Sequence, residues 1–224
     1  PYHRDRRTGE AGLHYMKGGR MKSRYVFAGI VVIALVLVTI GLLQVVSAND
    51  PGGYTKSWDG GPSGTGTNWA DAANWSPDGV PNNSDKVFID SGSGVTISSG
   101  IQHIIWLHSH QPITLSGGTL ELDQPSLIAD DFTLDSAGTL TGAGNLDISG
   151  KFTWGWGTMS GAGVTNASGG IDLVVTSTGD KRLYRTLNNK SGSTATYVTG
   201  AAYFYIDAPG VFNNESGAIF NWQT

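Results

Sequence analysis

A short phrase occurs three times in the C-terminal part of this chain and limits the folds open to it. The copies read Val-Thr-Asn-Ala-Ser-Gly-Gly at 164–170, Leu-Asn-Asn-Lys-Ser-Gly-Ser at 187–193 and Phe-Asn-Asn-Glu-Ser-Gly-Ala at 212–218. Aligned on Asn166, Asn189 and Asn214, they recur about every 24 residues. Self-similarity at a fixed period of this size is typical of a solenoid, in which each repeat forms one coil.

A second phrase, Gly-Thr-Leu or Gly-Thr-Met, precedes these copies. It occurs at 118–120, 138–140 and 157–159, which is about every 20 residues. Between the phrases, apolar residues such as Phe152 and Trp154 keep the two-residue alternation of strands with one buried face. Gly, Ser, Asn and Asp separate these stretches and favour tight turns. The pattern predicts an all-β fold, a parallel β-helix (β-solenoid) of about six coils.

The repeated asparagines predict a structural role. If each repeat is one coil, equivalent residues stack at the inter-strand spacing of about 4.8 Å, and their side-chain amides can bond to one another in a ladder. We therefore expect Asn166, Asn189 and Asn214 to lie in one column. All three also match the N-glycosylation pattern, as do Asn74 and Asn82, so glycan attachment is the alternative.

The N-terminal region has a different composition. Residues 1–20 form a basic tail or translated upstream sequence, and Met21 opens a basic stretch followed by an uncharged stretch at 25–46. The Val-Ser-Ala ending at Ala48 is typical of a cleaved signal peptide, whereas the length of the apolar stretch is sufficient for a membrane anchor. Segment 21–48 is thus either a signal peptide or an anchor, and both alternatives place the remainder outside the cytoplasm.

Charge and cysteine content support export. Seven of the 14 Lys and Arg residues lie in residues 1–24, and the chain from Asn49 onward has a net charge of −9. A basic segment before the apolar stretch follows the positive-inside tendency, and an acidic remainder excludes nucleic acid as a partner. The absence of Cys excludes disulfides and thiolate metal sites. We predict a secreted or cell-surface protein without a cofactor, whose membrane contact is the N-terminal segment if it stays uncleaved.

Segment 49–90 is rich in tryptophan and turn residues. Trp58, Trp69 and Trp75 lie close together in the sequence, separated by Gly, Pro and Asn. A solenoid needs a cap over the apolar rows and strand edges of its first coil, so we interpret 49–90 as that cap and 91–224 as the repeats. Because the repeat pattern continues to Thr224, we expect the chain to be an N-terminal fragment of a longer protein.

The Trp-rich segment and the repeated phrases together carry a resemblance. The Asn-Trp and Pro-x-x-x-Asp elements of 68–85, with the Gly-Thr-Leu and Phe-Asn-Asn-x-Ser-Gly-Ala phrases, resemble bacterial exported autotransporter-like or adhesin-like β-helical repeat proteins. The resemblance covers about residues 57–224 and implies a right-handed coil. It implies a scaffold and transfers no catalytic residue.

Two residue pairs are candidates for ligand binding. Trp154 and Trp156 share a face if they lie in one strand, where two indoles would form a platform for sugar rings, although they could equally pack in the core. His108 and His110 also share a face and could hold a metal ion, but zinc needs at least one further ligand and His103 falls on the opposite alternation. An outward polar face is the alternative for the histidines.

The charged residues give only weak signals of catalysis. Glycoside hydrolysis needs two carboxylates facing one bond, and adjacent Asp130 and Asp131 point to opposite sides of a strand. The remaining candidates are the carboxylates Asp131, Asp135 and Asp147 and a basic cluster of Lys181, Arg182 and Arg185. We therefore expect an exported structural and adhesive scaffold, with extracellular glycans or surface matrix as partners. A polysaccharide-degrading β-helix enzyme, a lyase or glycoside hydrolase, is the alternative.

Overall fold

The computed structural model describes residues 52–174, 179–200 and 202–223. The predicted tail at 1–20 and the whole of the predicted signal peptide or anchor at 21–48, including the apolar stretch 25–46, lie outside these residues. In the part of the chain that is described, no helix combines the length and hydrophobicity needed to cross a membrane. The single helical element there is the short 3-10 helix η1 (Ala72–Asn74).

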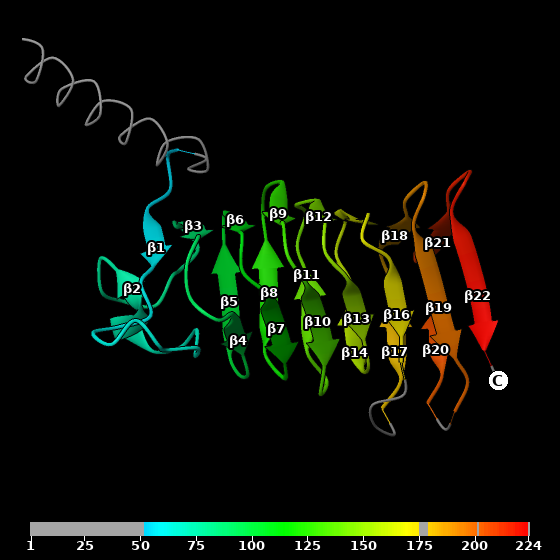
Figure 1. Cartoon of the computed structure of the whole chain (residues 1–224), viewed down its shortest axis with the longest axis horizontal. Helices are drawn as coiled ribbons and strands as arrows, with labels where there is room; N and C mark the ends of the chain where they lie inside the picture. Colours follow the sequence, from blue (N-terminus) through cyan, green and yellow to red (C-terminus); the bar gives the residue numbers. More distant parts are fainter. Residues whose placement is uncertain (1–51, 175–178, 201, 224) are drawn as a thin grey trace, which may run out of the picture. The chain divides into compact units, whose positions relative to one another are not determined.

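The described unit is a parallel β-solenoid of about six coils, as the repeats predict. Figure 1 shows the strands stacked along its long axis, from the cyan end at β1 to the red end at β22. Each coil passes in turn through three sheets, which we call A, B and C. All strand pairs are parallel except β1 with β2. The handedness of the coil stays a prediction.

Sheet A has nine strands and carries the residues discussed below. In hydrogen-bonding order it comprises β2 (Trp75–Ser76), β1 (Lys56–Trp58), β3 (Lys86–Ile89), β6 (Trp106–Ser109), β9 (Ser126–Ile128), β12 (Leu146–Ile148), β15 (Val164–Ala167), β18 (Thr186–Asn189) and β21 (Val211–Asn214).

Sheets B and C have seven and six strands. Sheet B comprises β22 (Ile219–Gln223), β19 (Thr194–Val198), β16 (Ile171–Leu173), β13 (Phe152–Trp154), β10 (Phe132–Asp135), β7 (Ile113–Ser116) and β4 (Val95–Ile97). Sheet C comprises β20 (Phe204–Ile206), β17 (Lys181–Leu183), β14 (Gly157–Met159), β11 (Thr139–Thr141), β8 (Thr119–Leu122) and β5 (Ile101–Ile104).

The core consists of apolar columns, because every second residue of a strand points into the coil. In sheet B, Phe132 stacks on Phe152 of the next coil with ring centroids 5.4 Å apart and an interplanar angle of 17°. In sheet C, the Leu or Met of each Gly-Thr-Leu phrase is fully buried, in register from Leu120 through Leu140 to Met159. Like residues therefore pack on like, which explains the repeat in the sequence.

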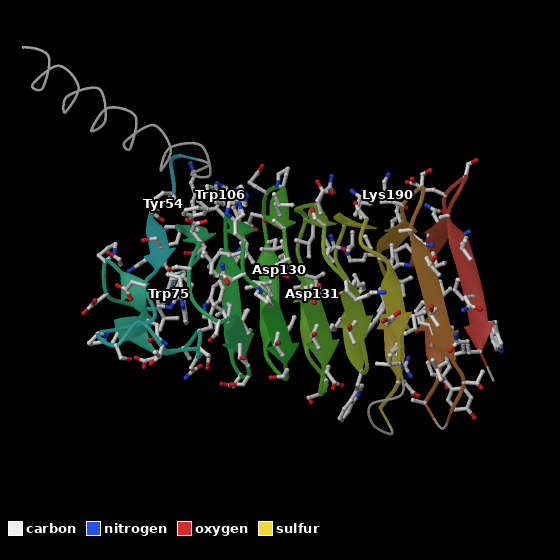
Figure 2. The ribbon with its side chains drawn as sticks, in the orientation of Figure 1. Tyr54, Trp75, Trp106, Asp130, Asp131 and Lys190 are labelled. Carbon is white, nitrogen blue, oxygen red and sulfur yellow. The ribbon has the colours of Figure 1, made fainter. Side chains whose placement is uncertain are left out.

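The Trp-rich segment is part of the same unit. Trp69 and Trp75 are fully buried and Trp58 is 4 % exposed, and the indole of Trp75 lies 4.8 Å from each of the other two. The Trp75 Nε1–H donates to the carbonyl of Trp69. Strand β1 pairs with β3 of sheet A, and the amide of Trp69 donates to the carbonyl of Thr96 in β4. Figure 2 shows Trp75 at the first-coil end of the stack.

Candidate functional site

A hollow lies on the outer face of sheet A. It is a shallow groove of about 450 Å³, lined by Trp106 and His108 of β6, Leu127 of β9 and Asp147 of β12, with Pro125 beside them. Register partners of a parallel stack lie above one another, so these side chains form two adjoining rows. One row contains His108, Leu127 and Asp147, and the other contains Trp106 and Pro125. The groove therefore has an aromatic and apolar floor and a carboxylate at one side.

Further aromatic side chains continue this face toward the first coil. The Phe88 ring lies 5.3 Å from Tyr54, 5.8 Å from His108 and 5.7 Å from His110, measured between ring centroids. Figure 2 labels Tyr54 and Trp106 here. Partial burial and the neighbouring His110 lower the pKa of His108, and Asp90 opposes this less strongly. His108 is thus predominantly neutral at neutral pH and can accept or donate a hydrogen bond.

The predicted metal pair, His108 and His110, lies on one face with ring centroids 4.9 Å apart. His110 Nδ1 is 2.7 Å from Oδ1 of Asp90. Among the described residues, however, the one group of three potential ligands that converge closely lies elsewhere and includes neither His108 nor His110. A metal site at His108 and His110 stays a prediction without a third ligand.

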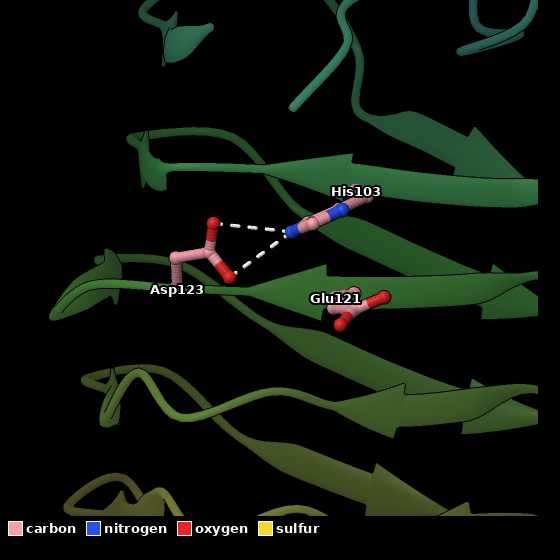
Figure 3. A group of neighbouring side chains, drawn as sticks. All are labelled: His103, Glu121 and Asp123. Atoms are coloured by element: carbon pink, nitrogen blue, oxygen red, sulfur yellow. Dashed lines mark hydrogen bonds and ion pairs between the residues drawn. The ribbon is translucent and has the colours of Figure 1, made fainter. Parts of the chain in front are cut away.

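The converging group comprises His103 of β5, Glu121 of β8 and Asp123 just after β8 (Figure 3). One ligand atom from each side chain lies within 4.8 Å of the other two. His103 Nε2 is 3.0 Å from Oδ1 and 3.1 Å from Oδ2 of Asp123. The sequence analysis did not predict this group. Aligning Gly100 with Gly118, the first residue of a Gly-Thr-Leu phrase, would have placed His103 next to Glu121 on the neighbouring coil.

The asparagines form two columns instead of the single predicted one. Asn166 is in register with Asn188, not Asn189, and Asn188 is in register with Asn213. Each donates its side-chain N–H to the preceding oxygen: Asn213 to Asn188 at 2.9 Å, Asn188 to Asn166 at 2.7 Å, and Asn166 to Asp147 at 2.7 Å. This outer column continues the row of His108 and Leu127 away from the groove.

The second column occupies inward positions and contains Asn189 and, on the next coil, Asn214, which is exposed. Asn189 is fully buried, donates to Oδ1 of Asn214 at 2.7 Å and accepts from the Ser193 hydroxyl at 2.6 Å. The predicted alignment failed because the turn after β18 has four residues before β19, whereas three residues separate β15 from β16. The longer turn needs an internal polar anchor. Burial of Asn189, and of Asn74 at 3 % exposure, closes those two side chains to glycan attachment in the folded chain.

The platform of Trp154 and Trp156 does not form. Trp154 is fully buried and stacks on Phe152 with centroids 5.9 Å apart, as the packing alternative predicted, whereas Trp156 is 36 % exposed. The strand ends at Trp154, so the alternation that would place both on one face ends there too. Trp156 instead lies in a smaller hollow beside Asp180 and Arg182.

The candidate charged clusters do not form either. Lys181 and Arg185 are buried at 0 % and 2 % exposure, whereas Arg182 is exposed and lies 3.3 Å from Asp207. Burial lowers the pKa of Arg185 to about 10, and its guanidinium donates to the carbonyls of Gly144 and Ser160 on earlier coils.

The three carboxylates are equally dispersed. Asp147 lies on sheet A and accepts from Asn166. Asp131 directly precedes sheet-B strand β10 and Asp135 is its last residue, and they accept from the backbone amides of Lys151 and Ser136. Of the three, Asp147 alone lines the groove on sheet A. The arrangement expected of a glycosidase is thus not assembled from these residues.

Comparison with known protein families, with curated proteins and with solved structures finds no match to this chain. The assignment of the fold as a β-solenoid therefore rests on the strand pairing and register alone. The resemblance to exported adhesin-like repeat proteins stays a prediction from the motifs.

Proposed function

We propose that this chain is an exported structural and adhesive scaffold that holds extracellular glycans along one face. The observation that carries the proposal is the outer row of sheet A, which runs in register from Phe88 through His108, Leu127 and Asp147 to the amides of Asn166, Asn188 and Asn213. A stack with such continuous register is stiff, because each coil is hydrogen-bonded to both neighbours. Such a rod is suited to displaying a binding face.

The groove at Trp106 is the proposed glycan site. An indole covers the apolar face of a sugar ring, and side-chain amides exchange hydrogen bonds with hydroxyl groups. Asn166 and Asn188 each use one N–H and one lone pair within the column, and Asn213 uses one N–H, so each of these amides keeps a second N–H and at least one lone pair for a ligand. These amides repeat along the stack at the coil spacing of about 4.8 Å. They can therefore form a series of hydrogen bonds to the hydroxyl groups of an uncharged polysaccharide.

Binding is favoured over cleavage at this groove. Hydrolysis of a glycosidic bond needs a pair of carboxylates. The groove's described lining offers one, Asp147, whose Oδ1 is already bonded to Asn166 at 2.7 Å. A scaffold that retains glycans is therefore preferred to the enzyme alternative.

The Trp-rich segment supports the scaffold role as an N-terminal cap. Its tryptophans cover the first coil's apolar interior, and β1 and the Trp69 backbone occupy edges of sheets A and B. Covering these edges prevents pairing with other chains.

A retention assay tests the glycan site. The full chain is incubated with insoluble cellulose or chitin, and bound protein is measured after washing. We expect retention by the native chain and at least about a tenfold loss in Trp106→Ala, because stacking aromatics dominate such contacts. Trp156→Ala is the matched control and should retain the native level. Equal retention of native chain and Trp106→Ala, or a loss confined to Trp156→Ala, would reject the site at Trp106.

A protease-accessibility assay tests export. The full chain carrying a C-terminal tag is expressed in bacterial cells, and a protease is added outside. We expect loss of the tag from intact cells or its appearance in the medium, since segment 21–48 has the features of a signal peptide or anchor. A tag that survives until the cells are lysed would reject export.

A further inference from the structure

We propose that His103, Glu121 and Asp123 form a binding site for a divalent transition-metal ion of the Zn²⁺ class, located on the outer face of sheet C. This inference is independent of the proposed glycan site, which lies on sheet A. His103 comes from β5 and the two carboxylates come from the next coil. A bound ion would therefore join two neighbouring coils.

The strand register places the ligands. His103 and Glu121 are direct partners in the parallel pair of β5 and β8, so their outward side chains are neighbours about 4.8 Å apart along the axis. Asp123 follows Glu121 by two residues and returns to the same side of the chain. Figure 3 shows the three side chains gathered on this surface, with the Asp123 carboxylate facing the His103 ring.

The distances suit coordination after a small adjustment. Zinc bonds to imidazole nitrogen and carboxylate oxygen at about 2.0–2.2 Å, so neighbouring ligand atoms of a tetrahedral site lie about 3.3 Å apart. His103 Nε2 is 3.0 and 3.1 Å from the Asp123 oxygens. The remaining ligand atom, from Glu121, lies within 4.8 Å of both, which a rotamer change of a partly exposed side chain can close.

The charge of the group favours a cation. Glu121 forms no ion pair or hydrogen bond with the described residues, and the only ion-pair partner of Asp123 there is His103. The side chains of His103 and Asp123 are 34 % and 43 % exposed, so an ion can reach them. One imidazole with two carboxylates is a donor set for zinc and leaves a fourth position for water, whereas Mg²⁺ and Ca²⁺ prefer oxygen ligands alone.

The chain contains a matched control pair. His110 and Asp90 also come from neighbouring coils and form a His–Asp contact at 2.7 Å, but Glu121 has no counterpart among the ligands beside them. If a His–Asp contact alone sufficed for binding, this second pair would bind the metal as well. If three converging ligands are required, only the His103 group will bind.

The test is calorimetric titration of the full chain with ZnCl₂. We expect one binding event of about 1:1 stoichiometry, at least about a tenfold loss of affinity in Glu121→Gln and a larger loss in His103→Ala, while His110→Ala keeps the native affinity. Glu121→Gln leaves the His103–Asp123 contact intact, and circular dichroism of each variant verifies folding.

Three results would overturn the proposal. The first is that titration of the native chain with ZnCl₂ releases or absorbs no more heat than titration of the His103→Ala variant. The second is zinc binding that is lost in His110→Ala and kept in His103→Ala. The third is an equally tight response to CaCl₂ that His103→Ala leaves unchanged, because such a site would be a set of oxygen ligands only.

Discussion

The first coils and the last coils of this solenoid differ in length. The sequence separation between register partners in sheet A is 19 at the step into Asn166, but it is 22 and 25 at the next two steps, to Asn188 and Asn213. The coils therefore grow longer toward the C-terminal end of the stack.

The interiors of these coils differ as well. The early interior consists of apolar columns with small hydroxyl groups such as Ser126, whose Oγ accepts from the amide of Leu107 at 3.0 Å. The late interior contains Lys181, Arg185 and Asn189. Larger polar side chains thus accompany the longer coils.

The difference shows what coil length demands. A turn of three residues is closed by backbone bonds and glycine, whereas a longer turn brings additional peptide groups into the interior that need partners. Asn189 makes polar contacts beside this turn: its amide donates to the carbonyl of Ile219 on the next coil, and its oxygen accepts from the hydroxyl of Ser193, the last residue of the turn. We therefore expect the early coils to depend on apolar packing and the late coils on internal polar contacts.

Loss of an apolar column should destabilise the fold most. Trp154→Ala should lower the free energy of unfolding by about 3–5 kcal/mol, because a fully buried indole leaves a cavity among Phe152 and Phe204. Urea unfolding followed by circular dichroism measures it. Trp156→Ala, at 36 % exposure, is the control and should cost about 1 kcal/mol or less. Equal costs would show that both indoles are core residues.

The two asparagine columns can be compared directly. Asn189→Ala should cost about 2–3 kcal/mol, because it removes a fully buried side chain whose amide donates to the Ile219 carbonyl and to Asn214 and whose oxygen accepts from the Ser193 hydroxyl. Asn188→Ala, in the outer column, should cost about 0.5–1 kcal/mol, because water can replace the lost amide. Urea unfolding of both variants measures the difference. A larger cost for Asn188 would mean that the outer ladder stabilises the late coils.

Lys181 is expected to destabilise the late coils. It is fully buried, its Nζ has no hydrogen-bond partner among the described residues, and burial lowers its pKa more than Asp135 and Asp180 raise it. Lys181→Met keeps the length of the side chain and removes the charge, so it should stabilise the fold by about 1–2 kcal/mol.

The control for Lys181 is Lys151→Met. The Lys151 side chain is 42 % exposed and lies 3.5 Å from Asp172, so its replacement should change the free energy of unfolding by about 0.5 kcal/mol or less. Thermal unfolding of both variants measures the change. Destabilisation by Lys181→Met would show that the ammonium group has a stabilising partner.

The weakest effect concerns pH and the early coils. The pKa of His108 is lowered in the folded chain, so near and below pH 6.5 the unfolded chain binds more protons at this position. His108 therefore reduces stability as the pH falls from about 6.5 through its lowered folded pKa. His108→Asn should reduce the loss of Tm between pH 7.5 and pH 5. An identical loss in the variant would assign the acid sensitivity to other groups.

Much of the fold could be predicted from the repeats. The parallel β-solenoid, about six coils and the inward Phe and Leu positions follow from the period and the alternation. The site was less predictable, because a spacing of two residues does not by itself place two side chains on one face once a strand has ended. Beyond the end of β13, Trp156 is exposed while Trp154 is buried, whereas His108 and His110 stay on one face although β6 ends at Ser109 between them.

The stacking of like residues follows from the amino-acid sequence alone, because a period of about 20 residues has few other physical solutions. The register does not, since a turn lengthened by one residue moves Asn189 from the outer amide column to the interior. Register also placed Lys181 in the inward position of Gly157 and His103 beside Glu121. The lengths of the turns decide which residues of neighbouring coils meet. Those lengths depend on backbone and side-chain hydrogen bonds that form only in the folded coil, so they belong to the tertiary structure.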